Sequence, residues 1–248
     1  MPALGRAFYE RHTLAVARDL VGKVLVVHRP GCARLAGRIV EVEAYRQGDP
    51  AAHSARGRTP RAAVLFGPAG VAYVYRIHQQ HCLNLVTETD GVPGGVLIRG
   101  IVPLEGLAVM QTQRGPCKKP ADLTNGPGKL CRALGITIRD NSTPLVGANI
   151  FVEDDGYTCA VATTRRIGIS KGVELEWRFV EVPAAPAARV VSPARRPRAS
   201  LAAPATAAAA SLDADGGAGG DDVVAVNVAK KLKPFALRLG DCALSRDP

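Results

Sequence analysis

The feature that most constrains the fold is a run of alternating apolar and polar residues from Gly37 to Tyr45. Successive side chains of a β-strand point to opposite sides of a sheet, so this alternation predicts a strand with two chemically different faces. Val40, Val42 and Ala44 share one face, and Glu41, Glu43 and Tyr45 share the other. We expect one face to cover an apolar core and the other to present two carboxylates and an aromatic ring.

A second β-rich run, Val71 to Ile77, carries Tyr73 and Tyr75 two positions apart. Residues at this spacing lie on the same face of a strand. A carboxylate walled by aromatic rings can hold a planar base and activate a water molecule. The two runs together therefore indicate a binding site.

Weaker patterns extend this picture to a domain of mixed structure. They predict a helix over Tyr9 to Leu20, strands over Val24 to His28 and Gly95 to Arg99, and a short helix within Asn125 to Gly135. Strand runs separated by loops, with few regularly spaced helices, favour an α+β fold over a doubly wound sheet. We expect a single α+β domain with a curved, mainly antiparallel β-sheet flanked by helices.

The composition changes sharply near residue 183. The stretch from Pro183 to Gly220 is dominated by Ala, Pro, Gly and Ser, and it contains no aromatic residue. Such a low-complexity sequence cannot bury enough apolar surface to offset the entropy lost on folding. We predict a folded domain over residues 1–182 and a largely disordered C-terminal tail over residues 183–248.

The chain carries a formal net charge of +10, with a pI of about 9.6. This excess favours a polyanionic partner, although solvated surface charge explains the same balance equally well. The sequence has neither a long apolar run nor an apolar stretch behind its first residues. We therefore expect no membrane span, no secretory signal and an intracellular location.

The six cysteines are far apart, and no Cys-x-x-Cys or paired-histidine pattern accompanies them. Structural zinc sites use closely spaced cysteine and histidine ligands, so the sequence predicts no metal site. A chain of this size without a secretory signal is expected to keep its thiols reduced.

Glu43 is the strongest candidate for a catalytic residue. A carboxylate beside Tyr45 on a partly apolar face would lie in a reduced dielectric and could polarise a water molecule as a general base. The alternative is a structural glutamate paired with an arginine such as Arg38 or Arg99, because structural ion pairs perturb carboxylates as well. The run by itself supports the two interpretations equally.

Other residues have the chemistry of a base-binding site. The rings of Tyr45, Tyr73 and Tyr75 can stack on a purine, although a place in the core is the default for aromatic residues. His53 lies in a polar loop, where it would either donate to a base, orient a water molecule or simply be exposed. The amide of Asn84 needs hydrogen-bond partners, which either a base edge or a turn would provide.

Lys129 is a candidate phosphate contact. The helix start from Gly126 to Lys129 offers backbone N–H groups to an anion. It lacks the complete phosphate-loop pattern, so hydrolysis of a nucleoside triphosphate is not expected. Strand cleavage through a Schiff base would need an amine nucleophile, and phosphate contact suits the position of Lys129 better.

Taken together, the motifs between residues 9 and 181 resemble the alkyladenine (3-methyladenine) DNA glycosylase family. The matching segments are Leu14 to Lys23, Gly37 to Tyr45, Ala51 to Ser54, Arg58 to Arg61, Phe66 to Pro68, Tyr73 to Tyr75, Cys82 to Asn84, Val96 to Arg99, Pro103 to Gly106, Gly126 to Leu134, Arg166 to Ile169 and Trp177 to Phe179. The set in this order is specific, whereas each segment alone is not. The resemblance favours the catalytic interpretation of Glu43.

The resemblance implies a monofunctional enzyme of base excision repair. Such an enzyme turns a damaged purine out of duplex DNA and cleaves its N-glycosidic bond with water. The implied substrates are 3-methyladenine and 7-methylguanine, with hypoxanthine as a further candidate. The implied partner is double-stranded DNA containing damaged purines, bound by a monomer without a metal or an organic cofactor.

The resemblance also assigns roles to residues of this sequence. Glu43 would deprotonate the attacking water, and Arg99 would hold that water or the carboxylate. Tyr45, His53 and Tyr75 would line the base pocket, Tyr73 would support its wall, and Asn84 would clash with the exocyclic amine of guanine.

One segment departs from the family pattern. After Tyr73 to Tyr75 the family continues with a hairpin whose tyrosine wedges into the gap left by the flipped nucleotide. This chain instead reads Arg76-Ile77-His78-Gln79-Gln80-His81 and is one residue shorter. His78 takes the position of the wedge, and its smaller, polar ring is expected to fill the gap less well.

Two alternatives from other classes follow from these features. The altered hairpin suggests a damage-binding protein with reduced or no excision activity. A glycosidase acting on sugars would use Glu41 and Glu43 together, at a carboxylate separation within the range of such enzymes. Side by side on one strand, however, these carboxylates could not readily flank a scissile bond.

Overall fold

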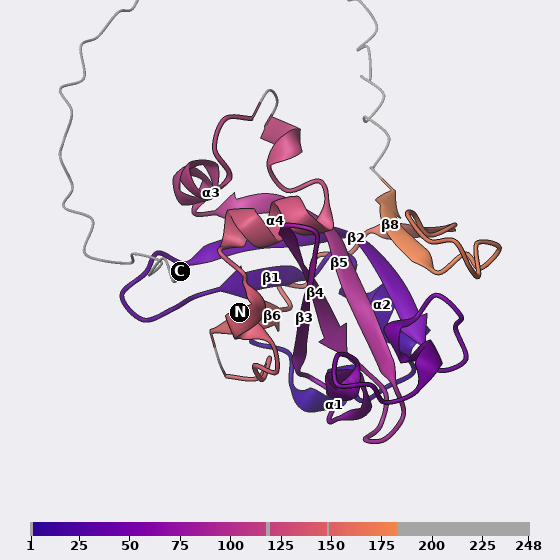
Figure 1. Ribbon diagram of the computed structural model, residues 1–248. Helices are drawn as coiled ribbons and strands as arrows, with labels where there is room; N and C mark the ends of the chain where they lie inside the picture. Colours follow the sequence, from indigo (N-terminus) through magenta and orange to yellow (C-terminus); the bar gives the residue numbers. More distant parts are fainter. Residues whose placement is uncertain (1, 118–119, 148, 183–248) are drawn as a thin grey trace, which may run out of the picture. The chain divides into compact units, whose positions relative to one another are not determined.

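An antiparallel β-sheet forms the framework of the described residues (Figure 1). The structure is a computed structural model that describes residues 2–117, 120–147 and 149–182. Its strands are β1 (Val24–Val27), β2 (Leu35–Arg46), β3 (Ala72–Ile77), β4 (Gln80–Val86), β5 (Gly94–Glu105), β6 (Ile150–Glu153), β7 (Ala160–Thr164) and β8 (Arg178–Val182). The sheet order is β3-β4-β5-β2-β1-β6, and β8 pairs with both β2 and β7.

Short helices pack against this sheet. They are α1 (Arg6–Tyr9), α2 (Thr13–Leu20), α3 (Leu107–Arg114) and α4 (Pro127–Leu134), joined by the 3₁₀ turns η1 (His53–Arg56), η2 (Ala63–Phe66), η3 (Pro120–Leu123) and η4 (Ile138–Asp140). Helix α2 packs on β2 and β5, and α4 packs on β4 and β5 (Figure 1). The predicted α+β fold with a curved, mainly antiparallel sheet is confirmed. The predicted tail, residues 183–248, lies outside the described residues.

The single helix predicted over Tyr9 to Leu20 is wrong, because the chain forms two helices with a break between them. Helix α1 ends at Tyr9, and α2 begins at Thr13. The Thr13 N–H and hydroxyl donate to Glu88 Oε1 at 2.8 and 2.7 Å. The Glu88 carboxylate comes from a distant part of the chain and accepts from an N–H at the helix start that has no partner within the helix. Helical periodicity cannot reveal such a contact.

The short helix predicted after Asn125 is confirmed as α4. Pro127 occupies its first turn, where a missing N–H costs nothing. Gly135 ends it in the left-handed conformation, with φ of 64°. The N–H of Gly135 donates to the carbonyls of Cys131 and Arg132, which would otherwise be unpaired.

The alternation predicted along β2 is interrupted in its middle. Ile39 pairs with Ile101 and Val42 with Ile98, but Val40 and Arg99 have no partner across the two strands. Each strand therefore carries one extra residue, which is the pattern of a β-bulge. The prediction that Val40 faces the core with Val42 is wrong, because Ile39 takes that place and Val40 is half-buried.

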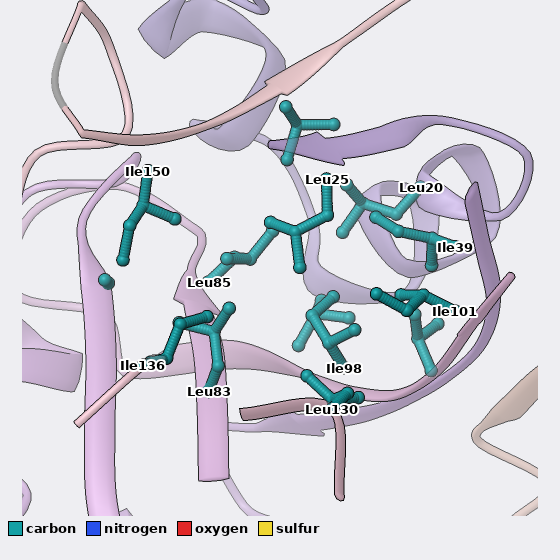
Figure 2. Packing of buried hydrophobic residues seen from close by; sticks show 14 of the residues in the cluster. Leu20, Leu25, Ile39, Leu83, Leu85, Ile98, Ile101, Leu130, Ile136 and Ile150 are labelled. Carbon is teal, nitrogen blue, oxygen red and sulfur yellow. The ribbon is translucent and has the colours of Figure 1, made fainter. Parts of the chain in front are cut away.

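The apolar core lies between the sheet and its helices. Figure 2 shows leucine and isoleucine side chains from α2, α4 and the strands converging on one another. The labelled members of this core are Leu20, Leu25, Ile39, Leu83, Leu85, Ile98, Ile101, Leu130, Ile136 and Ile150. Because one side of the sheet is filled in this way, the polar side chains of the same strands are directed to the other side.

Candidate active site

A row of paired residues crosses the sheet on the side away from the apolar core. Tyr73 on β3 pairs with Asn84 on β4, Asn84 pairs with Leu97 on β5, and Leu97 pairs with Glu43 on β2. Directly opposed residues of antiparallel strands point to the same side of the sheet. The register therefore brings together side chains that are distant along the chain, as Glu43 and Leu97 are.

The carboxylate of Glu43 is completely buried and accepts three hydrogen bonds. Its Oε1 accepts from the Ile167 N–H at 2.7 Å. Its Oε2 accepts from the Tyr45 hydroxyl at 2.8 Å and from Arg99 at 3.3 Å. Burial and the adjacent Glu43 charge raise the pKa of Tyr45, so that phenol stays protonated and acts as a donor.

Arg99 is shared between two carboxylates. Its Nε donates to Glu41 Oε1 at 2.8 Å, and Arg178 donates to the same oxygen at 2.7 Å. Burial lowers the pKa of Arg99, but the Glu43 and Glu41 charges outweigh it and leave that pKa above its ordinary value. Burial raises the pKa of Glu41, but hydrogen bonds from Arg178 and Arg99 outweigh it and lower that pKa. Arg99 and Glu41 are therefore both charged at neutral pH.

Three rings lie together at the Tyr73 end of the row. The His53 ring centroid is 4.5 Å from that of Tyr75 and 6.0 Å from that of Tyr73. The Tyr73 and Tyr75 centroids are 5.5 Å apart. These separations are typical of packed aromatic pairs, and they leave a ring-lined surface suited to a planar ligand.

His53 is fixed by a hydrogen bond between its Nδ1 and the Tyr73 hydroxyl, with 2.8 Å between the two atoms. Burial and the positive charge of Arg61 lower the pKa of His53 below its ordinary value of 6.5. The imidazole is therefore neutral at neutral pH, with one nitrogen as a donor and the other as an acceptor. The Arg61 guanidinium lies 5.0 Å from the centre of the Tyr75 ring.

These side chains border one open cleft of about 1170 Å³. Its lining includes the predicted residues Glu43, Tyr45, His53, Tyr73, Tyr75, Asn84 and Arg99. Asn84 is buried and donates to the backbone carbonyl of Tyr73 at 3.2 Å, which fixes the direction of its amide. The structure thus brings together every residue predicted to handle the base.

The remaining two predicted residues lie outside the lining of this cleft. His78 is exposed in the two-residue connection between β3 and β4, whereas its neighbour Ile77 is 48% exposed and borders the cleft. Lys129 lies in the first turn of α4, and its Nζ donates to Asn125 at 2.8 Å. Pro127, at the start of the same helix, borders the cleft.

This chain is similar to known proteins over most of its described residues. Residues 7–183 match the family model of methylpurine-DNA glycosylase. A relative from Methanoculleus marisnigri is 50% identical over 182 residues, which are 71% of this chain and 93% of the relative. Relatives from Rhodopseudomonas palustris (strain BisB18) and Salinibacter ruber are 48% and 45% identical, over 72% and 78% of this chain and 86% and 98% of their own lengths. Each is named "Putative 3-methyladenine DNA glycosylase".

This chain belongs to the methylpurine-DNA glycosylase family. Family membership shows a DNA repair enzyme, a hydrolase that cleaves N-glycosidic bonds, with DNA as its substrate. The matched residues extend over the whole described sheet and include the whole lining of the cleft.

Sequence reasoning missed several groups around the glycosylase cleft. The Ile167 N–H is a main-chain donor, so no side-chain pattern announces it. Asp49 and Arg166 form a fully buried ion pair, although Asp49 reads as an ordinary loop residue. Arg178 shares Glu41 with Arg99. The only signals available were the places of Arg166, Ile167 and Arg178 in motifs of the resemblance.

Among the described residues of this glycosylase, none of the helices has the length and apolar character that a membrane span requires. The described residues also include no group of three or more His, Cys, Asp or Glu side chains arranged to hold a metal ion.

Proposed function

We propose that this glycosylase excises 3-methyladenine and 7-methylguanine from double-stranded DNA, with hypoxanthine as a further substrate, and that it acts as a monomer. The observation that carries the proposal is a buried Glu43 carboxylate in the wall of a ring-lined cleft.

Glu43 is proposed as the general base. An ionised carboxylate has about four lone-pair positions. Tyr45 and Arg99 occupy both positions of Oε2, and the Ile167 N–H occupies one position of Oε1. One position on Oε1 is left for a water molecule. Glu43 takes a proton from this water while the water oxygen attacks the sugar carbon of the flipped nucleotide.

The bond that breaks joins this sugar carbon to the purine nitrogen, and its electron pair leaves with the base. A purine alkylated at a ring nitrogen is cationic, so it departs as a neutral molecule and needs little acid catalysis. Hypoxanthine is neutral and needs a proton donor in addition. We therefore expect it to be released more slowly than 3-methyladenine.

The rings are proposed to select the flipped base. Tyr45, His53 and Tyr75 would line the faces of the purine, where stacking contributes about 1–3 kcal/mol per base. Tyr73 would support this wall through its hydrogen bond to His53. The amide of Asn84, fixed on the Tyr73 carbonyl, would exclude the exocyclic amine of guanine.

Two residues outside the cleft are proposed to hold the duplex. His78 would enter the gap left by the flipped nucleotide, and Lys129 would contact a phosphate near the start of α4. A hairpin that holds the gap poorly would leave a damage-binding protein with little excision, which is the second candidate function.

The decisive experiment measures single-turnover release of 3-methyladenine and hypoxanthine from duplex DNA, with the dissociation constant measured in parallel. Wild-type protein is compared with Glu43→Gln and with Glu105→Gln, which changes a carboxylate remote from the cleft. We expect release by wild type and Glu105→Gln, and a loss of roughly 10²–10⁴-fold in Glu43→Gln with binding retained.

Tight binding of damaged DNA without release by wild type would favour the damage-binding alternative. Equal release by wild type and Glu43→Gln would exclude Glu43 as the base.

A further inference from the structure

The most deeply buried ion pair of the described residues borders the cleft through Asp49 and has no part in the chemistry proposed above. The guanidinium of Arg166 binds both carboxylate oxygens of Asp49, through Nη1 and, at 2.9 Å, through Nη2, and both side chains are fully buried. Bidentate pairing fixes the plane of a guanidinium as well as its position. Arg166 is therefore held in one orientation.

The oriented guanidinium of Arg166 in turn contacts two aromatic rings near the site. The Arg166 Cζ lies 4.7 Å from the centre of the Tyr45 ring and 5.2 Å from that of Trp177. Its Nη1 also donates to the Ala44 carbonyl at 3.0 Å, between Glu43 and Tyr45 in the chain. A planar cation over the Tyr45 ring and a hydrogen bond beside it together fix the phenol that donates to Glu43.

The same ion pair also influences the donor to Oε1 of Glu43. Arg166 immediately precedes Ile167, whose N–H donates to Glu43 Oε1. The place of this N–H follows from the place of the Arg166 backbone. Two of the three donors to the Glu43 carboxylate thus depend on one buried guanidinium.

Asp49 extends the connection to the histidine wall. Its Oδ1 accepts from the Ala51 N–H at 2.9 Å, and its backbone carbonyl accepts from the Ala52 N–H at 3.1 Å. These bonds shape the loop that leads into η1, which begins at His53.

We propose that the Asp49–Arg166 pair is a positioning device that sets the direction of the free lone pair of Glu43 and the place of the pocket rings. Neither residue touches the reacting atoms, so both are positioning residues. The proposal rests on the proposed function of Glu43. Misplacing reacting groups by about 1 Å can cost about a hundredfold in rate. Substitution of either residue of this pair should therefore slow excision.

The test compares Arg166→Lys and Asp49→Asn with wild type in single-turnover excision of 3-methyladenine across a range of pH. The matched control is Arg38→Lys, because Arg38 also binds both oxygens of an aspartate, Asp155, and lies 4.1 Å from the centre of a tyrosine ring, Tyr157, away from the cleft. Lysine keeps the charge but loses the planar, bidentate contact. Circular dichroism and a titration of active sites correct each rate for the folded fraction.

We expect the corrected rate to fall roughly tenfold to a hundredfold in Arg166→Lys and Asp49→Asn, with little change in the dissociation constant for damaged DNA. In Arg166→Lys, which keeps the charge, the acidic limb of the pH–rate profile should move to higher pH, because a carboxylate that loses donors is protonated more readily. Arg99, Tyr45 and, through Arg99, Glu41 still face Glu43 in these variants. Arg38→Lys should match wild type in both measurements.

A wild-type rate and pH profile in a folded Arg166→Lys protein would overturn the proposal, as would equal losses in Arg166→Lys and Arg38→Lys. If single substitutions prevent folding, the double variant Asp49→Leu with Arg166→Met removes both charges together, and the same kinetic loss is required of it. Absence of excision by wild type would instead refute the proposed function, so the two failures are distinguishable.

Discussion

At the scale of single residues, Arg99 divides its hydrogen bonds between Glu41 and Glu43. Glu41 holds the Nε of this guanidinium at 2.8 Å, whereas the contact to Glu43 is longer, at 3.3 Å. Glu41 therefore keeps Arg99 from binding the proposed base at full strength. Its negative charge also favours protonation of the neighbouring carboxylate.

Substituting Glu41 by glutamine should weaken the base without removing it. With one carboxylate neutral, Arg99 binds Glu43 more strongly, so we expect the acidic limb of the pH–rate profile to move to lower pH. We also expect a slower single-turnover rate, by less than the roughly 10²–10⁴-fold loss in Glu43→Gln. A pH series of excision rates checks both effects, and a limb that moves to higher pH would contradict them.

His53 gives a second prediction at this scale, for stability against pH. Its pKa in the folded protein is below the ordinary value of 6.5, so the unfolded chain binds the proton more readily. Its stabilising contribution is therefore complete above about pH 6.5 and is lost as the pH falls through the lower folded value. Denaturant titrations should show a smaller loss of unfolding free energy between neutral and mildly acidic pH in His53→Gln. An identical slope in both proteins would contradict this prediction.

At the scale of elements, the β3–β4 hairpin combines a tight connection with an unusual residue. Ile77 pairs with Gln80, which leaves His78 and Gln79 as the connection, and His78 has a φ of 51°. Two-residue hairpins of this kind favour glycine at a position with positive φ. The hairpin thus keeps a histidine at its tip where the backbone disfavours one.

His78→Gly separates the proposed wedge from the conformation of the hairpin. Glycine relieves the strain of the left-handed backbone, which stabilises the folded protein, but it increases the entropy of the unfolded chain, which destabilises it. The two effects oppose each other, so the unfolding free energy should change by less than about 1 kcal/mol. Lesion retention and single-turnover excision should nevertheless fall. Ile77→Ala is the companion variant, because Ile77 is apolar, 48% exposed and borders the cleft. A loss of lesion retention and excision confined to Ile77→Ala would indicate that Ile77, and not His78, is the wedge.

At the scale of the whole molecule, the net charge of +10 favours binding to the phosphate backbone. If Lys129 contacts a phosphate, Lys129→Ala should weaken binding to damaged and undamaged duplexes alike and reduce the slope of log K against log salt by about 1. Lys23→Ala is the control, since Lys23 pairs with Asp154 at 2.6 Å away from the cleft. Fluorescence anisotropy over a range of salt concentrations distinguishes the two variants. An unchanged slope would remove Lys129 from the phosphate contacts.

Local patterns were sufficient for part of the fold. Alternation predicted β2 and β3, and the proline and glycine signals predicted α4, because each depends on residues adjacent in the chain. The same reasoning did not predict β4, β6, β7, β8 or α3. It also joined α1 and α2 into one helix, because the carboxylate of Glu88 that defines the start of α2 is distant in sequence.

The sequence by itself determined which chemical groups this protein has: the paired carboxylates of β2, the tyrosines of β3 and the motifs that identified the family. Only the tertiary structure decided how they meet. Pairing across β3, β4, β5 and β2 aligned Tyr73, Asn84 and Glu43, and the bulge pair displaced Val40 from the core. No local pattern indicated that Asp49 pairs with Arg166 or that the Ile167 N–H donates to Glu43. Hydrogen bonds and ion pairs between distant segments depend on strand register and loop path, and neither is encoded in the spacing of neighbouring residues.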